Sequence, residues 1–169
     1  MPIDKINQPQ IIYISSNLRL RRFDNDYNFA LQWYQDLELV KLVDGPVASV
    51  YTKEKLKRMY EYLNHKGELY FIEVLEENEY KPIGDVALCK DNLPIVIGDK
   101  LYHNKGIGKK VLKSLILRAR ELDFECINIQ EIYDYNTYSK KLFESLGFKG
   151  YGETTNGKSY ILEISDLID

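Results

Sequence analysis

Residues 94–120 constrain the fold of this chain more than any other stretch. A β-branched run at 95–97 ends at Gly98, a polar loop follows, and Gly106-Ile107-Gly108 opens an amphipathic helix. This order of strand, glycine loop and helix is typical of a phosphate-binding site, because the first turn of a helix has N–H groups without partners and a partial positive charge. Glycines also let a ligand approach the backbone closely. The same glycines suit a plain turn and helix cap, so the loop alone leaves both interpretations open.

Length and charge limit the classes of protein to consider. The 169 residues predict a single domain, residues 1–169. A net charge of −3 argues against nucleic acid or an acidic membrane as the main partner. The N-terminal residues lack an apolar signal core, and no apolar run approaches the roughly 20 residues of a membrane span. We therefore expect no membrane partner and a cytoplasmic location.

The distribution of cysteines and charges is more specific. Cys89 and Cys126 lie far apart, each in an apolar run and without a CxxC or His/Cys cluster, so we expect reduced core residues and no metal site. Residues 99–120 carry seven Lys or Arg against one Asp, whereas residues 23–48 carry five Asp or Glu against one Lys. The glycine loop is therefore basic and the N-terminal region acidic.

Hydrophobic periodicity predicts the remaining elements. An apolar run at 11–14 and an alternating run at 18–23 place the first strand, and further strands are expected at 69–75, 83–90, 126–132 and 160–164. Helices are expected from about 24 to 39, after Thr52, after Gly106 and after Asn136, the last ending at Gly147. Because a crossover helix joins them, the strands at 95–97 and 126–132 should run parallel. The predicted fold class is α/β (α+β), a mixed central sheet with helices on both faces.

Two motifs resemble those of the GCN5-related N-acetyltransferases, the GNAT superfamily. Residues 103–108 read HNKGIG, which is similar to the family's acyl-CoA loop, Arg/Gln-x-x-Gly-x-Gly/Ala, with His103 in place of Arg or Gln. Residues 136–148 read NTYSKKLFESLGF, which is similar to Asn-x-x-Ala/Ser-x-x-Leu-Tyr-Glu-x-x-Gly-Phe, with Phe143 in place of Tyr. The predicted N-terminal helices are compatible with the subset resembling ribosomal-protein N-terminal acetyltransferases and aminoglycoside 6'-N-acetyltransferases.

The resemblance implies the GNAT fold and acetyl-CoA as co-substrate, lying in a V-shaped opening where the two parallel strands splay apart. Backbone groups near 96–98 would bind the pantetheine arm, with an N–H around Gly98 polarising the thioester, and the loop N–H groups would hold the pyrophosphate. Asn136 would contact the cofactor arm, or would only cap its helix. The implied cofactor-binding residues are Val96, Ile97, Gly98, His103, Asn104, Lys105, Gly106, Ile107, Gly108, Lys109, Asn136 and Ser139.

The resemblance also suggests catalytic residues. Glu131, five residues before Asn136, matches the base position of the ribosomal-protein N-terminal acetyltransferases, and it faces the cleft if Ile129, Glu131 and Tyr133 share one strand face. An exposed strand carboxylate or an ion-pair partner explains Glu131 equally well. Asp85 and Asp91 are further candidates for the base.

The general acid must be another group, because Phe143 cannot donate a proton. We predict Tyr138 as this proton donor, with Tyr135, Tyr133 or solvent as alternatives.

These observations predict an acetyl-CoA-dependent N-acetyltransferase that moves an acetyl group directly to a primary amine. The acidic N-terminal region suggests a cationic acceptor, either a small molecule or a peptide. A non-catalytic acyl-CoA-binding module or sensor is the alternative. A Rossmann-like nucleotide-binding domain is disfavoured, since the chain has one GxG and no repeated βαβ set. The oligomeric state stays open, with a homodimer among the options.

Overall fold

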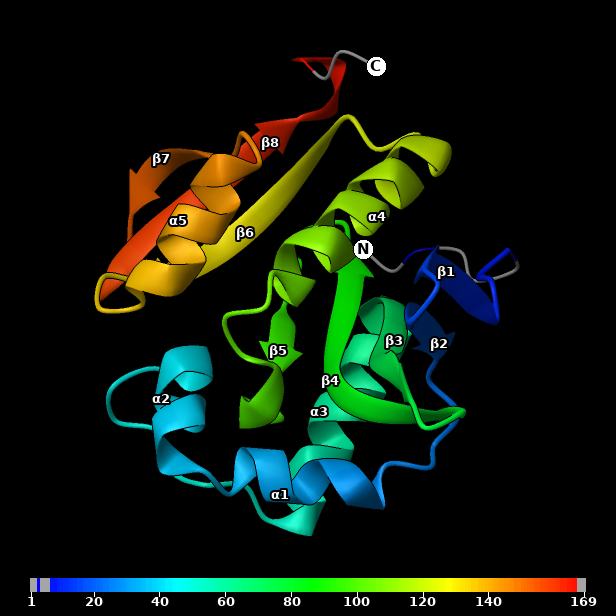
Figure 1. Ribbon diagram of the computed structural model, residues 1–169. Coiled ribbons are helices and arrows are strands. Elements are labelled where there is room, and N and C mark those ends of the chain that lie inside the picture. The colour runs from blue at the N-terminus through cyan, green and yellow to red at the C-terminus, as the bar shows by residue number, and fades with distance from the viewer. Residues whose placement is uncertain (1–2, 4–6, 167–169) are drawn as a thin grey trace.

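The strands of the computed structural model form two separate sheets (Figure 1), in a structure that describes residue 3 and residues 7–166. The strands are β1 (Ile11–Ser15), β2 (Leu18–Arg22), β3 (Gly67–Glu76), β4 (Glu79–Cys89), β5 (Ile95–Ile97), β6 (Cys126–Tyr133), β7 (Lys149–Glu153) and β8 (Gly157–Glu163). The helices are α1 (Leu31–Tyr34), α2 (Leu37–Asp44), α3 (Lys53–Lys66), α4 (Ile107–Glu121) and α5 (Thr137–Ser145), with short 3-10 turns η1 (Asn28–Ala30), η2 (Lys100–Tyr102) and η3 (Ile164–Asp166).

The larger sheet has the order β1-β2-β3-β4-β5 and the smaller one β6-β8-β7, and all neighbouring strands are antiparallel. The predicted α/β fold with helices on both faces is confirmed, but the single mixed sheet is not. Within residues 7–166 no backbone ladder joins β5 to β6, because β6 pairs with β8 from the C-terminal hairpin instead. A side-chain contact links the two regions: the Gln130 N–H donates to Asn92 Oδ1 at 3.0 Å.

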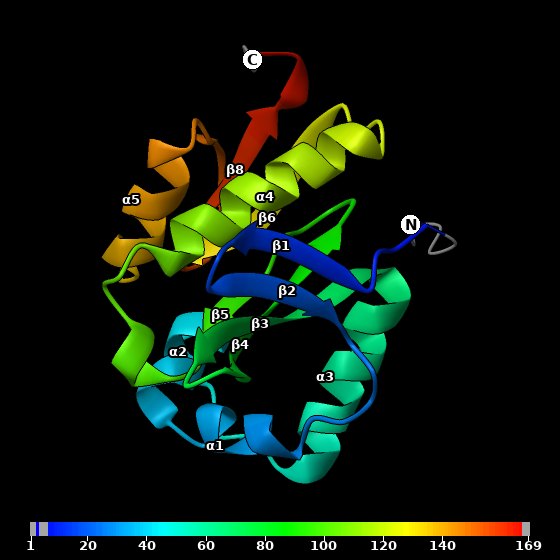
Figure 2. The same ribbon diagram turned by 45° about the vertical axis from the view of Figure 1, so that its right-hand side comes forward.

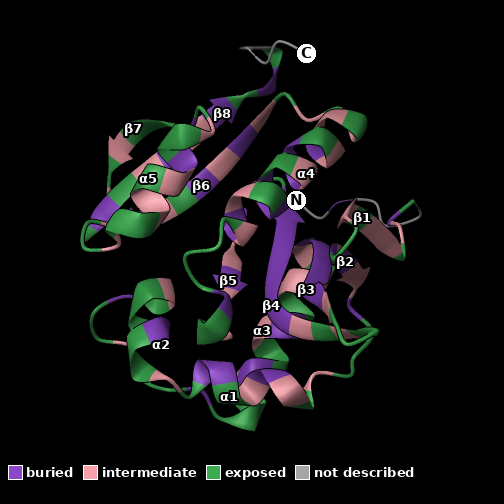
Figure 3. Cartoon of the chain, viewed as in Figure 1, coloured by how far each residue is buried: buried purple, intermediate pink, exposed green. Residues whose placement is uncertain are grey.

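Helices cover both faces of the larger sheet (Figures 1 and 2). Helix α4 packs through Val111, Leu112 and Leu115 into a core that also holds β6, β8 and α5. On the other face, α1, α2 and α3 enclose an aromatic core that includes Trp33 and Tyr60. The central strands β3 and β4 are buried along most of their length (Figure 3). No helix of the described residues is long and apolar enough to cross a bilayer.

Most local predictions agree with the structure, and three do not. Thr52 and Asn136 cap α3 and α5, and Gly147 has a positive φ of 96° just beyond α5. The single helix expected at about 24–39 is instead η1, α1 and α2, because the Asp36 side chain accepts from the Glu38 N–H and starts a new helix. Strands β3 and β4 extend beyond the predicted ranges of 69–75 and 83–90, so that their hairpin turns at residues 77–78. Strand β7 was not predicted.

A buried carboxylate joins the sheet to the helices beneath it. Asp85 on β4 pairs with Val96 on β5 and is 3% exposed, and its Oδ2 accepts from the hydroxyls of Tyr34 at 2.6 Å and Tyr60 at 2.8 Å. Burial raises the pKa of Asp85 to about 6, although the two phenol donors act in the opposite direction. This cluster connects α1, α3 and the strand next to β5.

We predict that Asp85 makes stability depend on pH. Its folded-state pKa of about 6 lies above the roughly 3.9 of an unfolded Asp, so its contribution is complete below about pH 4 and is lost as the pH rises through 6. The free energy of unfolding of wild type relative to Asp85→Asn should fall by on the order of 3 kcal/mol from pH 4 to pH 7. Urea unfolding at several pH values measures this difference, with Asp91→Asn, whose side chain is 45% exposed, as the control for a carboxylate outside the core. Parallel wild-type and Asp85→Asn curves would contradict the assignment.

Candidate active site

One edge of β5 is unpaired with any strand of the described structure. The Gly98 N–H donates to the Ile83 carbonyl at 2.8 Å, and the Ala87 N–H donates to the Pro94 carbonyl at 3.0 Å. Because ladder hydrogen bonds alternate along an antiparallel strand, the backbone groups of Ile95 and Ile97 point away from β4. An extended ligand can therefore bind along this edge as an added strand would.

The end of β5 is held in place by close packing. A Cβ atom at Gly98 would lie 2.2 Å from the Trp33 ring, so only glycine fits here. Trp33 is 5% exposed and packs in the core on this side of the sheet. Since the Gly98 N–H is already paired with Ile83, the N–H expected around Gly98 for a thioester carbonyl is that of Ile97.

His103 contacts this same edge. Its Nε2 lies 2.7 Å from the Ile97 carbonyl oxygen, and because a carbonyl can only accept, Nε2 carries the hydrogen. The side chain therefore ties the glycine loop back to β5. A role for His103 in contacting the cofactor stays a prediction.

The glycine loop ends in an open helix terminus. Gly106 is the N-cap of α4 with a φ of 75°, and no side chain of the described structure caps it. A Cβ atom at Gly106 would meet nothing within 4 Å, so space lies in front of the first-turn N–H groups. The preceding segment is anchored by ion pairs of Lys100 with Asp36 at 2.9 Å and of Lys81 with Asp99 at 3.1 Å. These features fit a pyrophosphate group.

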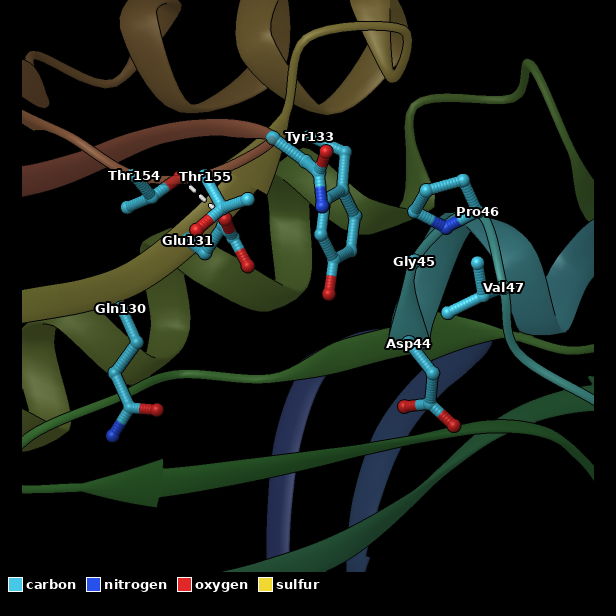
Figure 4. Close-up of a pocket in the computed structure, with 10 residues that line it drawn as sticks. Asp44, Gly45, Pro46, Val47, Gln130, Glu131, Tyr133, Thr154 and Thr155 are labelled. Atoms are coloured by element: carbon cyan, nitrogen blue, oxygen red, sulfur yellow. Dashed lines mark hydrogen bonds between the residues drawn. The ribbon is translucent and has the colours of Figure 1, made fainter.

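A hollow of about 400 Å³ lies where α2, β6 and the turn between β7 and β8 meet (Figure 4). Its lining residues are Asp44, Gly45, Pro46, Val47, Gln130, Glu131, Tyr133, Thr154, Thr155 and Asn156. Residues 44–47 lie at the end of α2 and just after it. Gln130, Glu131 and Tyr133 belong to β6, and residues 154–156 form the turn between β7 and β8. The hollow thus brings together segments that are far apart in the sequence.

A bulge in β6 turns the strand's residues toward this hollow. The pairing with β8 slips between Ile129 and Ile132, which are both buried although they are three residues apart. The condition that Ile129, Glu131 and Tyr133 share one strand face is therefore not met: Ile129 packs in the core, while the other two line the hollow.

The hollow is acidic. Glu131 Oε2 accepts a short hydrogen bond from the Thr154 hydroxyl, and Asp44 Oδ2 accepts from the Tyr51 hydroxyl at 2.6 Å. Burial, followed by the charges of Glu131 and Asp44, raises the pKa of Tyr133 above its ordinary value. Figure 4 shows the Tyr133 hydroxyl reaching toward the space between these carboxylates. Such a lining favours a cation.

The three candidate carboxylates differ in their surroundings. Asp85 is buried beneath the sheet and held by two tyrosines, and Asp91 pairs with Lys66 at 3.1 Å. Of the three, Glu131 alone lines the hollow. It is also the residue that matches the expected base position.

The candidate proton donors also differ in whether they line the hollow. Tyr138 is 52% exposed on the first turn of α5 and is not among the lining residues, and the Tyr135 hydroxyl donates to the Lys41 carbonyl. Tyr133 lines the hollow beside Glu131. Phe143 is 3% exposed and packs edge-on against Phe148 at a centroid distance of 5.1 Å. The structure thus explains Phe143 as a core residue.

Asn136 and Ser139 meet at the start of α5. The Ser139 N–H donates to Asn136 Oδ1 at 3.2 Å, which confirms the capping role of Asn136. Contact of either residue with a cofactor stays a prediction. No group of three or more His, Cys, Asp or Glu side chains in the described residues is arranged to hold a metal ion.

Sequence reasoning missed the roles of Asp44 and Thr154 in the hollow. Asp44 was noted only as part of an acidic region. Thr154 stands in the run Thr154-Thr155-Asn156-Gly157, whose composition is typical of a hairpin turn. That signal would have revealed the turn, but not that the turn lies against Glu131.

Comparison with known proteins identifies similar chains. The model of the acetyltransferase (GNAT) family matches residues 28–148. A curated relative from Bacillus subtilis subsp. natto, named a probable spermine N(1)-acetyltransferase, is 37% identical over 67 residues. That alignment covers 38% of this chain and 43% of the relative, so less than half of the relative's length is matched.

Solved structures share the fold at low sequence identity. A domain from Methanocaldococcus jannaschii has a TM-score of 0.75 at 21% identity, covering 88% of this chain and 99% of its own. An acetyltransferase from Salmonella typhimurium, described as modifying the N-terminal serine of ribosomal protein L7/L12, has a TM-score of 0.67 at 19% identity, covering 90% and 98%. The expected likeness in fold to a ribosomal-protein acetyltransferase is therefore confirmed.

We predict that Gly106→Val weakens acetyl-CoA binding by at least about tenfold, because a β-branched residue is strained at positive φ and its side chain would enter the space in front of the helix terminus. Titration calorimetry measures the Kd. Gly152→Val is the matched control, since its Cβ also meets open space but its backbone does not have a positive φ. Equal affinities for Gly106→Val and wild type would exclude this loop as the phosphate site.

Proposed function

Because the chain belongs to the acetyltransferase (GNAT) family, we propose that it is an acetyl-CoA-dependent N-acetyltransferase acting on a primary amine. The position of Glu131 is the observation that carries the proposal. This carboxylate lines an acidic hollow on β6, in the sheet that does not pair with the open edge of β5. A thioester bound at the edge of β5 and an amine bound in the hollow beside β6 would approach each other between these two strands, which belong to different sheets.

The residues present fit acetyl-CoA, which supplies an acetyl group activated as a thioester. The outward-facing backbone groups of Ile95 and the Ile97 N–H would hold the pantetheine arm, and the N–H groups after Gly106 would hold the pyrophosphate. Lys105, which is exposed beside the loop, would add positive charge. Cys89 and Cys126 form no disulfide in the described structure, which suits the reducing cytoplasm that we propose as its location.

The chemistry requires three functions from the chain. The Ile97 N–H would stabilise the negative charge that develops on the thioester oxygen. Glu131 would take a proton from the acceptor ammonium, directly or through water, so that the neutral nitrogen can attack. The departing thiolate would take a proton from Tyr138, on the first turn of α5, or from solvent, since Phe143 offers none.

The acceptor that we propose is a small cationic amine. Asp44 and Glu131 both line the hollow, so a second positive group on the acceptor would find a carboxylate. The relative named as a probable spermine acetyltransferase supports a polyamine. The Salmonella structure, whose description names a protein N-terminus, supports a peptide, although its likeness to this chain concerns the fold.

Phe143 favours a second candidate, a non-catalytic acyl-CoA-binding module. A buried phenylalanine stands where the family motif has tyrosine, so one expected proton donor is missing. Such a module would bind acetyl-CoA tightly and release no CoA with any amine.

We predict CoA release when the protein is given acetyl-CoA and a panel of polyamines, aminoglycosides and peptides, with polyamines the best acceptors. Glu131→Gln should lower kcat by about 100-fold or more, because general base catalysis contributes 10²–10⁴-fold. Glu153→Gln is the matched control, since the Glu153 carboxylate is 80% exposed and is not a lining residue. Full activity of Glu131→Gln would exclude Glu131 as the base. Binding of acetyl-CoA without release from any acceptor would favour the module.

A further inference from the structure

We infer that Thr154 is a positioning residue for Glu131, holding one oxygen of the carboxylate and leaving the other for the acceptor amine. The inference rests on the proposed function, in which Glu131 is the base. Thr154 lies in the turn between β7 and β8, outside both sequence motifs. This role makes the turn between β7 and β8 part of the site that orients the base.

The contact itself is specific. The Thr154 hydroxyl donates to Glu131 Oε2, and the bond is drawn in Figure 4. A carboxylate has two oxygens with about four acceptor sites, so a donor on Oε2 restrains the group, and Oε1 can still accept the proton beside the Tyr133 hydroxyl. In that step an N–H bond of the ammonium breaks and an O–H bond forms on Oε1, directly or through one water.

The turn that carries Thr154 is closed by its own hydrogen bond and is held against the chain just after Glu131. The Thr154 N–H donates to the Gly157 carbonyl at 2.9 Å, and the Asp134 N–H donates to the Asn156 carbonyl at 2.9 Å. A Cβ atom at Gly157 would lie 2.0 Å from the Ile132 carbonyl oxygen, so the turn packs directly on the β6 backbone. Because Thr is stiff at χ1, its hydroxyl is held where this turn places it.

Glu131 shares the hollow with two other titratable groups, Tyr133 on the same strand and Asp44 at the end of α2. The Tyr133 hydroxyl also interacts with the Glu131 carboxylate. Thr154 therefore does not act on an isolated carboxylate, and its own contribution is the hydrogen bond that restrains Oε2 from the side of the turn.

The test compares Thr154→Val, which removes only the hydroxyl, with Thr154→Ser, which keeps it. Thr154→Val should lower kcat about tenfold near neutral pH, as expected for a lost hydrogen bond to a charged group, with the KM for the amine changed less than about twofold. Thr154→Ser should stay within about threefold of wild type.

Ser159→Ala is the matched control for structural effects. The Ser159 hydroxyl donates to the Gln130 carbonyl at 2.7 Å, so this variant also loses a hydroxyl bond to β6 but none to Glu131. It should leave kcat and the KM for the amine unchanged, even if its Tm falls. Unchanged kcat in Thr154→Val, or equal losses in Thr154→Ser and Thr154→Val, would overturn the inference.

A readout without turnover separates this inference from the proposed function. The ¹³C resonance of the Glu131 carboxyl should shift in Thr154→Val and not in Thr154→Ser at the same pH. If wild type releases no CoA with any amine, the proposed function fails, and an unchanged resonance in Thr154→Val then rejects the contact as well. If Glu131→Gln is inactive while Thr154→Val matches wild type in kcat and resonance, only the inference about Thr154 fails.

Discussion

The backbone groups of Ile95, the Ile97 N–H and the first-turn N–H groups of α4 have no partner from a strand or a side-chain cap in the described residues, and the site depends on keeping these groups available to a ligand. Buried backbone groups need partners, so such an edge persists where a ligand or water can supply them. Three contacts maintain it: Trp33 packs against Gly98, Asp85 ties the neighbouring strand to Tyr34 and Tyr60, and His103 fastens the loop to Ile97. The second sheet turns away to pair with its own hairpin, which leaves the edge accessible.

Charge divides the two sides of this site. The loop after β5 is basic and leads into a helix N-terminus, which suits an anionic cofactor. The hollow beside β6 has two carboxylates, Asp44 and Glu131, which suits a cationic acceptor. Each carboxylate accepts from a hydroxyl, Tyr51 in one case and Thr154 in the other. The anionic cofactor would thus bind on the β5 side and the cationic acceptor on the β6 side, and the two would meet at the end of β5.

Features set by neighbouring residues could be predicted from the sequence, and those set by distant contacts could not. The caps at Thr52 and Asn136 and the left-handed Gly147 are local, and each was found. The break before Asp36 was missed because helical spacing continues across it, and the two-sheet arrangement depends on a pairing of β6 with β8 that no local pattern encodes. In the site, Glu131 was identified from its distance along the chain to Asn136, but its orientation toward the hollow depends on a bulge in β6, and its partner Thr154 lies 23 residues away in the chain.

The central claim is that acetyl-CoA binds along the open edge of β5 and at the N-terminus of α4. Amide hydrogen exchange, followed residue by residue with and without acetyl-CoA, tests this claim most directly. The account predicts that binding slows exchange at Ile97, Gly108 and Lys109, while Gly98, whose N–H is already bonded to Ile83, changes little. Binding that leaves Ile97 and the first turn of α4 unprotected, with protection elsewhere, would contradict it.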